Sequence, residues 1–427
     1  MSSDALNAWL QRLELRHPIV IDLGLDRIAQ VFGRLALGSL PTVITIAGTN
    51  GKGSVVACTE AGLRAAGARV GVYTSPHLID FNERIVIDGA PACDADIVAA
   101  FEAIERCRGE ISLSYFEFTT LAALWLFSRA GLDYWVMEVG LGGRLDAVNI
   151  LDADIAVITS IGIDHTEYLG ETREQIAPEK CGIARAGKPC VVVEADPPAS
   201  LAETLDRIGA KTMAMNAAWS VSDTHVRLAD GRSVPLPAVA GLLPRNVGAA
   251  LQVLALCGVD PAQAAVHDAV AAVRLPGRCY QRRVFGCETL YDVAHNCESV
   301  ALLRDYLTAH PVAGRTIAVF AAMADKPIHA MLSLIADQVD AWWCPALPDN
   351  PRAAQPSDVC AMLPRAVATP SADVPAALQA ARESMREDDR LLVFGSFFTV
   401  GAALKTDGGL SAPAHAAVGA TDTVRRA

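Results

Sequence analysis

The sequence predicts an α/β protein with a large, mainly parallel N-terminal sheet domain and a second, smaller α/β domain. Short, continuously apolar, β-branched segments alternate with longer helix-like segments, which is typical of parallel strands covered on both faces. The chain has 427 residues, which is enough for two or three domains. Hydrophobic residues make up 52% of the chain and charged residues 20%, so we expect large buried cores.

The first series of elements begins with a predicted buried strand over 42–48, TVITIAG. This strand leads into a glycine-rich loop and a predicted helix over 53–67. The helical segments between the later apolar runs supply the crossovers that parallel strands need. These later strands are expected over 69–73, 133–139, 154–161 and 189–194. A helical pattern with a break at 258–260 follows over 246–272, and we expect the first domain to span residues 1–274.

A second alternating series follows the segment LPGRCYQRR at 275–283. Its proline, glycine and arginines predict an interdomain linker. The next strands are expected over 288–295, 316–323, 339–344 and 389–397, with a helix over 375–386. This order indicates a Rossmann-like domain over 284–405. Residues 406–427 are rich in Gly, Ala, Pro and Thr, and we expect a disordered tail there.

Charge and cysteine content exclude several classes of protein. The 36 basic and 48 acidic residues give a net charge of −12, so we expect neither a nucleic acid nor a membrane as partner. The 11 cysteines are scattered without a C-x-x-C pair, which predicts free thiols and no zinc ribbon. The N-terminus does not resemble a signal peptide, and no apolar stretch approaches the roughly 18 residues of a membrane helix. We therefore expect a cytoplasmic protein.

The most informative segment is the glycine-rich loop GTNGKGS, which starts at Gly48. Glycines let backbone N–H groups turn towards an anion, and the following helix N-terminus adds partial positive charge. Lys52 is placed to reach the outer phosphates of a nucleotide, and Ser54 to offer a hydroxyl to Mg²⁺. The spacing departs from G-x-x-x-x-G-K-[ST], because Gly53 separates the lysine from the serine. We predict a P-loop-type ATP site of Gly51, Lys52, Gly53 and Ser54; the alternative is a glycine-rich turn with a solvated lysine.

Further motifs extend along nearly the whole chain. In order they are GTNGKGS, YTSPHL, SYFEFTT, MEVGLGGRLDAVN, TSIGIDHTEYLG, EKCGIAR, LPRN, LPGR, YDVAHN and FGSFFTV. In these motifs the chain resembles the folylpolyglutamate synthase/dihydrofolate synthase family, relatives of the Mur ligases. The resemblance implies an ATP-dependent ligase that adds L-glutamate to 7,8-dihydropteroate and to reduced folates through an acyl phosphate. The alternatives are a folylpolyglutamate synthase only, a Mur-type ligase and, from a different class, a nucleotide-switch ATPase.

The resemblance also implies metal and catalytic residues. It places Ser75, Glu138 and His165 around Mg²⁺, as one ion or two, with a monovalent cation as a further candidate. Oxygen ligands suit Mg²⁺, whereas an imidazole is softer than this ion prefers. Lys52, His165 and Lys180 are implied to be catalytic, Lys180 as a lysine carbamylated by CO₂. The structural alternatives are a partnered buried carboxylate, a capping or core histidine, and a surface pair of Glu179 with Lys180.

Contacts to ATP and to the acceptor follow from the same resemblance. Asn246, Arg278 and Asp292 are implied to contact ATP. His295 is expected either at the reaction centre or as a helix cap, and Cys297 stands where the family commonly has proline. The implied acceptor contacts are Ile21, Asp22, Ser114, Tyr115, Phe116, Glu117, Leu145, Asp146 and Ala147.

The chemistry of these acceptor residues agrees with a folate-like ligand. Aromatic faces and carboxylates fit a flat heterocycle with amino and ring N–H donors. The aromatic residues of this segment, Phe118 included, are also compatible with simple core packing. Arg84 and Arg144 are candidates to bind carboxylates, with surface arginines as the alternative. We expect a monomer that takes only small-molecule substrates.

Overall fold

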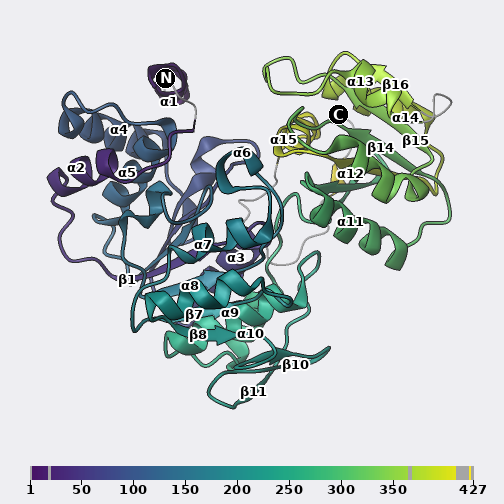
Figure 1. The fold of residues 1–427 in the computed structure, drawn as a ribbon. Coiled ribbons are helices and arrows are strands. Elements are labelled where there is room, and N and C mark those ends of the chain that lie inside the picture. The colour runs from purple at the N-terminus through teal and green to yellow at the C-terminus, as the bar shows by residue number, and fades with distance from the viewer. Residues whose placement is uncertain (1, 18–20, 364–367, 410–422, 425–427) are drawn as a thin grey trace. The chain divides into compact units, whose positions relative to one another are not determined.

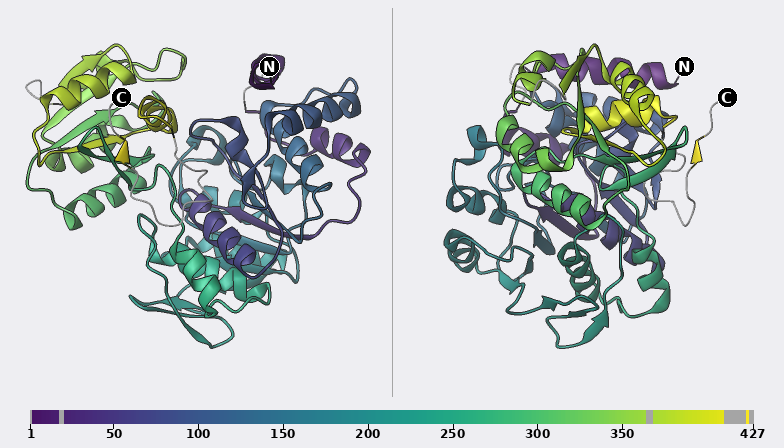
Figure 2. Two further views of the ribbon diagram at one scale, coloured as in Figure 1. Left: turned by 180° about the vertical axis from the view of Figure 1, so that it is seen from behind. Right: turned by 90° about the vertical axis from the view of Figure 1, so that its right-hand side faces the viewer.

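The computed structural model describes residues 2–17, 21–363, 368–409 and 423–424. They form two compact units (Figures 1 and 2). The first comprises Met1–His77 and Phe81–Val273, and the second comprises Leu78–Asp80 and Arg274–Ala427. The main division therefore falls at residues 273–274, next to the predicted boundary.

The first unit is built on an eight-stranded sheet with the order β4-β3-β2-β5-β1-β6-β7-β8. All neighbours from β2 to β8 are parallel, whereas β3 and β4 add an antiparallel edge. Five strands lie within the predicted ranges: β1 (Thr42–Ala47), β2 (Val70–Tyr73), β5 (Tyr134–Glu138), β6 (Ile155–Ile158) and β7 (Pro189–Val192). Three short strands near the edges were not predicted from the sequence: β3 (Ile85–Ile87), β4 (Ala90–Pro91) and β8 (Lys211–Ala214).

Successive residues of the parallel strands face two separate cores. In β1, Val43 and Ala47 belong to one core, and Ile44 and Ile46 to the other, because side chains alternate along a strand. The first core is covered by α1 (Ser2–Arg16), α2 (Asp26–Arg34), α4 (Asp94–Arg108), α5 (Tyr115–Phe127), α7 (Arg173–Cys181) and α8 (Ala199–Ile208). The second is covered by α3 (Lys52–Ala65), α9 (Pro244–Leu256) and α10 (Ala264–Ala271).

Several short elements complete the first unit. An antiparallel three-stranded sheet packs beside α9 and joins the second core. Its strands are β9 (Ser220–Val221), β10 (His225–Arg227) and β11 (Ser233–Pro235). Three one-turn helices follow strands of the large sheet. They are η1 (Phe81–Arg84) after β2, η2 (Ala147–Ile150) after β5 and α6 (Thr166–Leu169) after β6.

The second unit contains a seven-stranded sheet with the order β16-β15-β14-β17-β13-β12-β18. Among the described strands of this sheet, only the pair β12–β13 is antiparallel. The strands are β12 (Tyr280–Val284), β13 (Cys287–Asp292), β14 (Thr316–Phe320), β15 (Ala341–Pro345), β16 (Ala368–Ser371), β17 (Arg390–Phe394) and β18 (Thr423–Val424). One face packs on α11 (Cys297–Ala309), α12 (Ile328–Ile335), η3 (Ala336–Gln338) and α13 (Pro356–Ala361), the other on α14 (Val374–Ser384) and α15 (Phe397–Thr406).

Two predicted irregular segments differ from the structure. The predicted linker at 275–283 gives way at Tyr280 to β12, which pairs with β13. In the predicted tail, Asp407 is fully buried and accepts hydrogen bonds from Tyr291 and Arg382. Strand pairing at β12 and burial at Asp407 therefore give defined structure to residues whose composition predicts irregular segments. Residues 410–422 and 425–427 of that tail lie outside the described residues.

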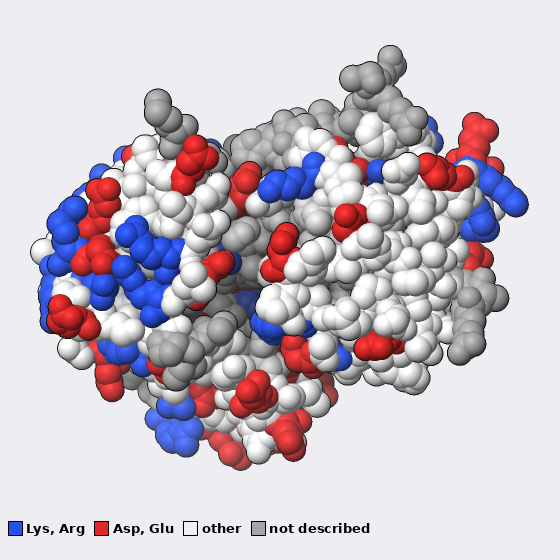
Figure 3. Space-filling model, turned by 90° about the horizontal axis from the view of Figure 1, so that it is seen from above, with Lys and Arg blue, Asp and Glu red and all other residues white. Residues whose placement is uncertain are grey.

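The surface and the thiols carry no unexpected chemistry in the described residues. All 11 cysteines are free thiols. Figure 3 shows Lys and Arg side chains intermingled with Asp and Glu over one face. None of the described helices is both long and apolar enough to cross a membrane.

Candidate active site

The glycine-rich loop joins β1 to α3 and turns at two glycines with positive φ. Gly48 has φ +152° and Gly51 has φ +88°. A Cβ atom on Gly51 would lie 2.5 Å from Nδ2 of Asn246. The predicted nucleotide residue Asn246, in the first turn of α9, is therefore packed directly against the loop. This close approach requires glycine at position 51.

The segment after β6 fastens the same loop. The backbone N–H of Thr49 donates to the carbonyl of Ser160 (2.8 Å), and that of Asn50 donates to the Ser160 hydroxyl (3.0 Å). The Thr159 hydroxyl donates to the Asn50 carbonyl (2.7 Å). The loop is thus held in one shape before any anion arrives. The TSIG motif is visible in the sequence, but it gave no prediction of this role for Thr159 or Ser160.

Lys52 opens α3, and its ammonium group folds back over the loop. Its Nζ atom donates to the carbonyls of Gly48 (2.9 Å) and Thr49 (3.3 Å). The predicted hydroxyl residue Ser54 is buried two positions further on. A lysine held over a glycine-rich loop at a helix N-terminus is placed as a phosphate cradle requires.

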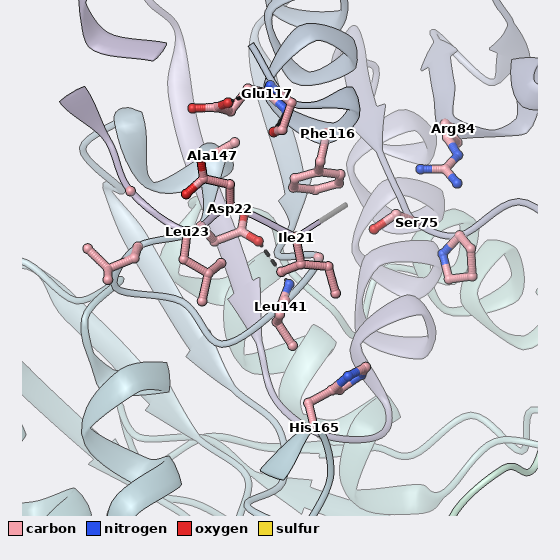
Figure 4. A pocket seen from close by; sticks show the side chains of 16 residues that line it. Ile21, Asp22, Leu23, Ser75, Arg84, Phe116, Glu117, Leu141, Ala147 and His165 are labelled. Carbon is pink, nitrogen blue, oxygen red and sulfur yellow. Dashed lines mark hydrogen bonds between the residues drawn. The ribbon is translucent and has the colours of Figure 1, made fainter. Parts of the chain in front are cut away.

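A cavity of about 250 Å³ opens within the first unit, where segments that follow β2, β5 and β6 meet. It brings together eight of the nine predicted acceptor residues, together with Ser75 and His165 (Figure 4). Tyr115 is the ninth, and it does not line the cavity. Five further lining residues were not predicted, because all are apolar or glycine and have no distinctive signal in the sequence: Leu23, Gly24, Pro76, Gly140 and Leu141.

The N-terminus of α5 places two of the lining residues. Ser114 and Glu117 form a capping box: the Ser114 N–H donates to Glu117 Oε2 (2.7 Å), and the Glu117 N–H donates to Ser114 Oγ (3.3 Å). Phe116 is turned to the cavity and abuts Gly140, where a Cβ atom would lie 2.6 Å from the ring. Phe118, in contrast, is fully buried in the core. The aromatic segment thus contains both a cavity residue and a core residue.

Three carboxylates line the cavity, and each is held differently. Asp22 pairs with Arg27 (2.7 Å) and lies 3.1 Å from Nε2 of His17. Nη2 of Arg27 also lies 3.3 Å from Oε1 of Glu117, an ion pair in which this buried oxygen accepts no hydrogen bond of good geometry from the described residues. Oε1 can therefore still accept from a ligand N–H beside the arginine.

The third carboxylate, Asp146, is held by backbone groups. It accepts from the N–H groups of Leu141 (2.8 Å) and Val148 (2.9 Å). Burial raises the pKa of Asp146 to about 6, although these hydrogen bonds and the charge of Lys52 act in the opposite direction. The group is therefore mostly ionised at pH 7 and mostly protonated at pH 5.

The three predicted metal ligands lie at the loop end of the large sheet. Glu138 ends β5, and its Oε2 atom lies 3.4 Å from the backbone nitrogen of Ser75, which follows β2. His165 has φ +52° at the start of α6 and shares the cavity lining with Ser75. No group of three His, Cys, Asp or Glu side chains in the described chain is arranged to hold a metal. The hydroxyl and carboxylate oxygens nevertheless suit a hard divalent cation that keeps several waters, and the imidazole is the softer third member of the set.

Lys180 is buried in the last turn of α7, with 4% of its surface exposed. Its neighbour Glu179 pairs with Arg144 at 2.8 Å, in an exposed position away from the cavity lining. The surface-pair alternative for Glu179 and Lys180 is therefore wrong, and Arg144 does not contribute to the cavity. A lysine buried at this depth needs a specific partner or a modification.

The second unit carries the remaining predicted nucleotide residues. Asp292, at the end of β13, accepts from the N–H groups of Cys279 and Ala294 (both 2.8 Å), and burial raises its pKa. The Arg278 guanidinium lies 5.8 Å from the ring centre of Phe397. The next helix, α11, is capped by Asn296 with Ser299, while Nδ1 of His295 lies 2.8 Å from the Val293 carbonyl. The side chain of His295 is thus not the cap.

Comparison with known proteins identifies relatives along the whole chain. Residues 46–227 match the Mur ligase middle domain, and residues 277–397 match the Mur ligase, glutamate ligase domain. The dihydrofolate synthase/folylpolyglutamate synthase of Escherichia coli is 41% identical over 407 residues, covering 93% of this chain and 94% of the relative.

Two solved structures extend this comparison to the fold. "E. coli FolC in complex with DHPP and ADP" superposes with a TM-score of 0.88 at 39% identity, over 95% of this chain and 98% of that one. A bifunctional folylpolyglutamate synthase/dihydrofolate synthase "with Mn, AMPPNP and L-Glutamate bound" gives a TM-score of 0.87 at 40% identity and the same coverage.

Proposed function

The chain belongs to the dihydrofolate synthase/folylpolyglutamate synthase family, and from this premise we propose how its residues carry out the family's reaction. It is an ATP-dependent glutamate ligase with both activities of the family. A match over nearly the full length sets aside the nucleotide-switch ATPase and the Mur-type cell-wall ligase. The remaining question is which residues bind the substrates and how they promote the reaction.

The single observation that carries the proposal is the cavity lined by Phe116 and the three carboxylates Asp22, Glu117 and Asp146. One relative was solved with DHPP, and we propose that this cavity takes the dihydropteroate acceptor. Phe116 offers a ring face, and Asp22, Glu117 and Asp146 offer acceptors for amino and ring N–H groups.

The reaction begins by activating the acceptor carboxylate, whose oxygen is otherwise a poor leaving group. One carboxylate oxygen attacks the γ-phosphorus of ATP, ADP departs, and an acyl phosphate forms. The unprotonated amine of L-glutamate then attacks the carbonyl carbon, the C–N bond forms, the C–O bond to the phosphate breaks, and the nitrogen loses a proton as inorganic phosphate departs. Positioning and charge neutralisation are the main tasks of the protein in such a sequence.

The glycine-rich loop and Lys52 supply that neutralisation on the nucleotide side. The N–H groups at the start of α3 and the Lys52 ammonium face the phosphates, with Ser54 and Asn246 beside them. In the second unit, Arg278 and Asp292 are the proposed nucleotide contacts, Asp292 chiefly by fixing the backbone around Cys279.

A divalent cation is the proposed cofactor, since one relative was solved with Mn and AMPPNP. We assign Mg²⁺ to Ser75, Glu138 and His165, where it would supply charge neutralisation to the phosphate oxygens. Lys180 is proposed to be carbamylated, because carbamylation would turn a buried cation into an anion that favours a nearby metal. Without bicarbonate, this chain should then lose activity that added bicarbonate restores.

Phosphate release from ATP tests the proposed function. We expect release that requires L-glutamate, both with dihydropteroate and with tetrahydrofolate as acceptor. Release with neither acceptor would contradict the ligase assignment, and release only with tetrahydrofolate would contradict the assignment of the cavity to dihydropteroate.

A further inference from the structure

Arg84 is the one lysine or arginine among the 16 described residues that line the cavity. It ends η1, and only 9% of its surface is exposed. In the described part of the chain, no carboxylate lies within ion-pairing distance of it. The cavity therefore contains a desolvated cation whose charge is not neutralised by the described residues.

The Arg84 side chain is also held in a fixed orientation. Its Nε–H donates to Nδ1 of His77 (2.8 Å). Its guanidinium carbon lies 5.7 Å from the ring centres of both Phe81 and Tyr115. These contacts fix the guanidinium plane and leave its two terminal nitrogens for a planar, bidentate partner, the geometry that a carboxylate presents.

The two ends of the cavity differ in charge. Figure 4 shows Arg84 and Ser75 at one side, Asp22 and Glu117 at the other, and the Phe116 ring between them. Asp22 and Glu117 share Arg27, which does not line the cavity. A ligand that fits has N–H donors at one end, a flat middle and an anion at the other.

We propose that Arg84, oriented by His77, binds the carboxylate of the acceptor and selects for acceptors that carry one. The inference rests on the proposed function and assigns the anionic end of the cavity. A carboxylate of L-glutamate presents the same chemistry; the acceptor is favoured because the anion site shares one cavity with the ring and N–H sites.

His77 acts here as a positioning residue. Nδ1 of its ring accepts the Arg84 Nε–H at 2.8 Å, and the centre of the same ring lies 6.1 Å from that of Phe81. The histidine therefore fixes the direction of the Nε–H and with it the plane of the guanidinium.

Equilibrium binding of two probes without ATP tests the proposal. The probes are dihydropteroate and the same molecule lacking its carboxyl group. In the wild type we expect the carboxylate to strengthen binding roughly 10- to 100-fold, the range of a hydrogen bond to a charged group. In Arg84→Gln the ratio of the two dissociation constants should fall to about 1, because dihydropteroate binds more weakly. The probe without the carboxyl group should bind within about twofold of its wild-type affinity. Arg129→Gln, an exposed arginine stacked on Trp125, is the matched control and should keep the ratio.

Variants of His77 separate positioning from a purely structural role. His77→Gln keeps an acceptor oxygen and should retain most of the ratio, whereas His77→Leu should lose much of it, both with the melting temperature checked. Equal loss for both probes in Arg84→Gln, or an unchanged ratio, would overturn the inference. A raised KM for glutamate with normal acceptor binding would overturn it as well. Glutamate-dependent phosphate release by the wild type tests the proposed function separately. If the wild type shows this release but the Arg84 variants do not behave as expected, the inference about Arg84 is wrong and the proposed function stands.

Discussion

At the scale of single residues, the charged groups of the site are held by different kinds of partner. The Lys52 ammonium donates to loop carbonyls, while Asp22 shares Arg27 with Glu117. Asp146 is held by backbone N–H groups, and burial raises its pKa to about 6. These differences give each residue its own expected response to substitution or pH.

Lys52 should be required for turnover but not for folding. Lys52→Ala removes the ammonium group that faces the phosphates, so we expect at least a 100-fold loss of kcat (about 3 kcal/mol) with an unchanged melting temperature. Lys188→Ala, on the surface and paired with Asp154, is the control. Near-normal turnover in Lys52→Ala would refute the assignment of the phosphate loop.

The affinity for dihydropteroate should depend on the ionisation of Asp146. Because a carboxylate accepts ligand N–H groups better than a carboxylic acid does, the Kd should rise as the pH falls below about 6. The free energy of unfolding should change with pH in the opposite sense. Asp146 binds its proton more tightly in the folded state, so its contribution to stability falls as the pH rises from 3.8 to about 6. Titration of the Kd between pH 5 and 8 checks the first statement, and a flat profile would contradict it.

At the scale of elements, loops and helix ends are positioned by contacts far apart in the sequence. Gly51 abuts Asn246, Asn50 bonds to Ser160, and Glu138 approaches Ser75. Parallel strands bring these segments together because their carboxyl ends meet at one edge of the sheet. The motifs are readable one by one, but their contacts follow from the strand order.

Gly51 should not tolerate a side chain, whereas Gly53 should. Gly51→Ala places a Cβ at φ +88° and 2.5 Å from Asn246, so we expect a loss of about 1–2 kcal/mol or more in the free energy of unfolding. Gly53 lies in the first turn of α3, and the Cβ of an alanine there would have no described atom within 4 Å, so Gly53→Ala should be neutral or slightly stabilising. Urea denaturation of both variants makes the comparison; equal stabilities would show that the loop is not constrained as described.

Asp407 should stabilise the second unit, although it lies in a segment of low-complexity composition. It is fully buried between Tyr291 and Arg382, so Asp407→Asn leaves an unneutralised arginine and should cost roughly 3–5 kcal/mol. Asp388→Asn changes an exposed aspartate nearby in the sequence and should have little effect. A melting temperature for Asp407→Asn equal to that of Asp388→Asn would disprove this role.

At the scale of the whole molecule, the sequence predicts the class and the central strands well. Continuous apolar runs identify β1, β2, β5, β6 and β7, because parallel strands buried on both faces are apolar at nearly every position. Edge strands such as β4 and β8 are short and partly exposed, so their pattern is weak. β12 follows a Pro-Gly-Arg segment that resembles a linker, and it is recognisable as a strand only from its pairing with β13.

The site was predictable to the extent that its residues lie in distinctive motifs. The Ser114-x-x-Glu117 box and the glycine-rich loop carry local signals. His77 lies in the YTSPHL motif, but the motif does not indicate its role, because that role depends on an Arg84 side chain brought beside it by a short helix. Nor does sequence separate Phe116 from Phe118, since both are aromatic residues on one helix and only packing distinguishes the cavity from the core.

The central claim is that ATP activates the acceptor carboxylate before glutamate attacks. The most direct test follows ¹⁸O from the acceptor to inorganic phosphate. It uses dihydropteroate labelled with ¹⁸O in both carboxylate oxygens. Because the attacking oxygen leaves with phosphate, we predict one ¹⁸O atom in the phosphate for each dihydrofolate formed. Product formation with unlabelled phosphate would contradict this mechanism.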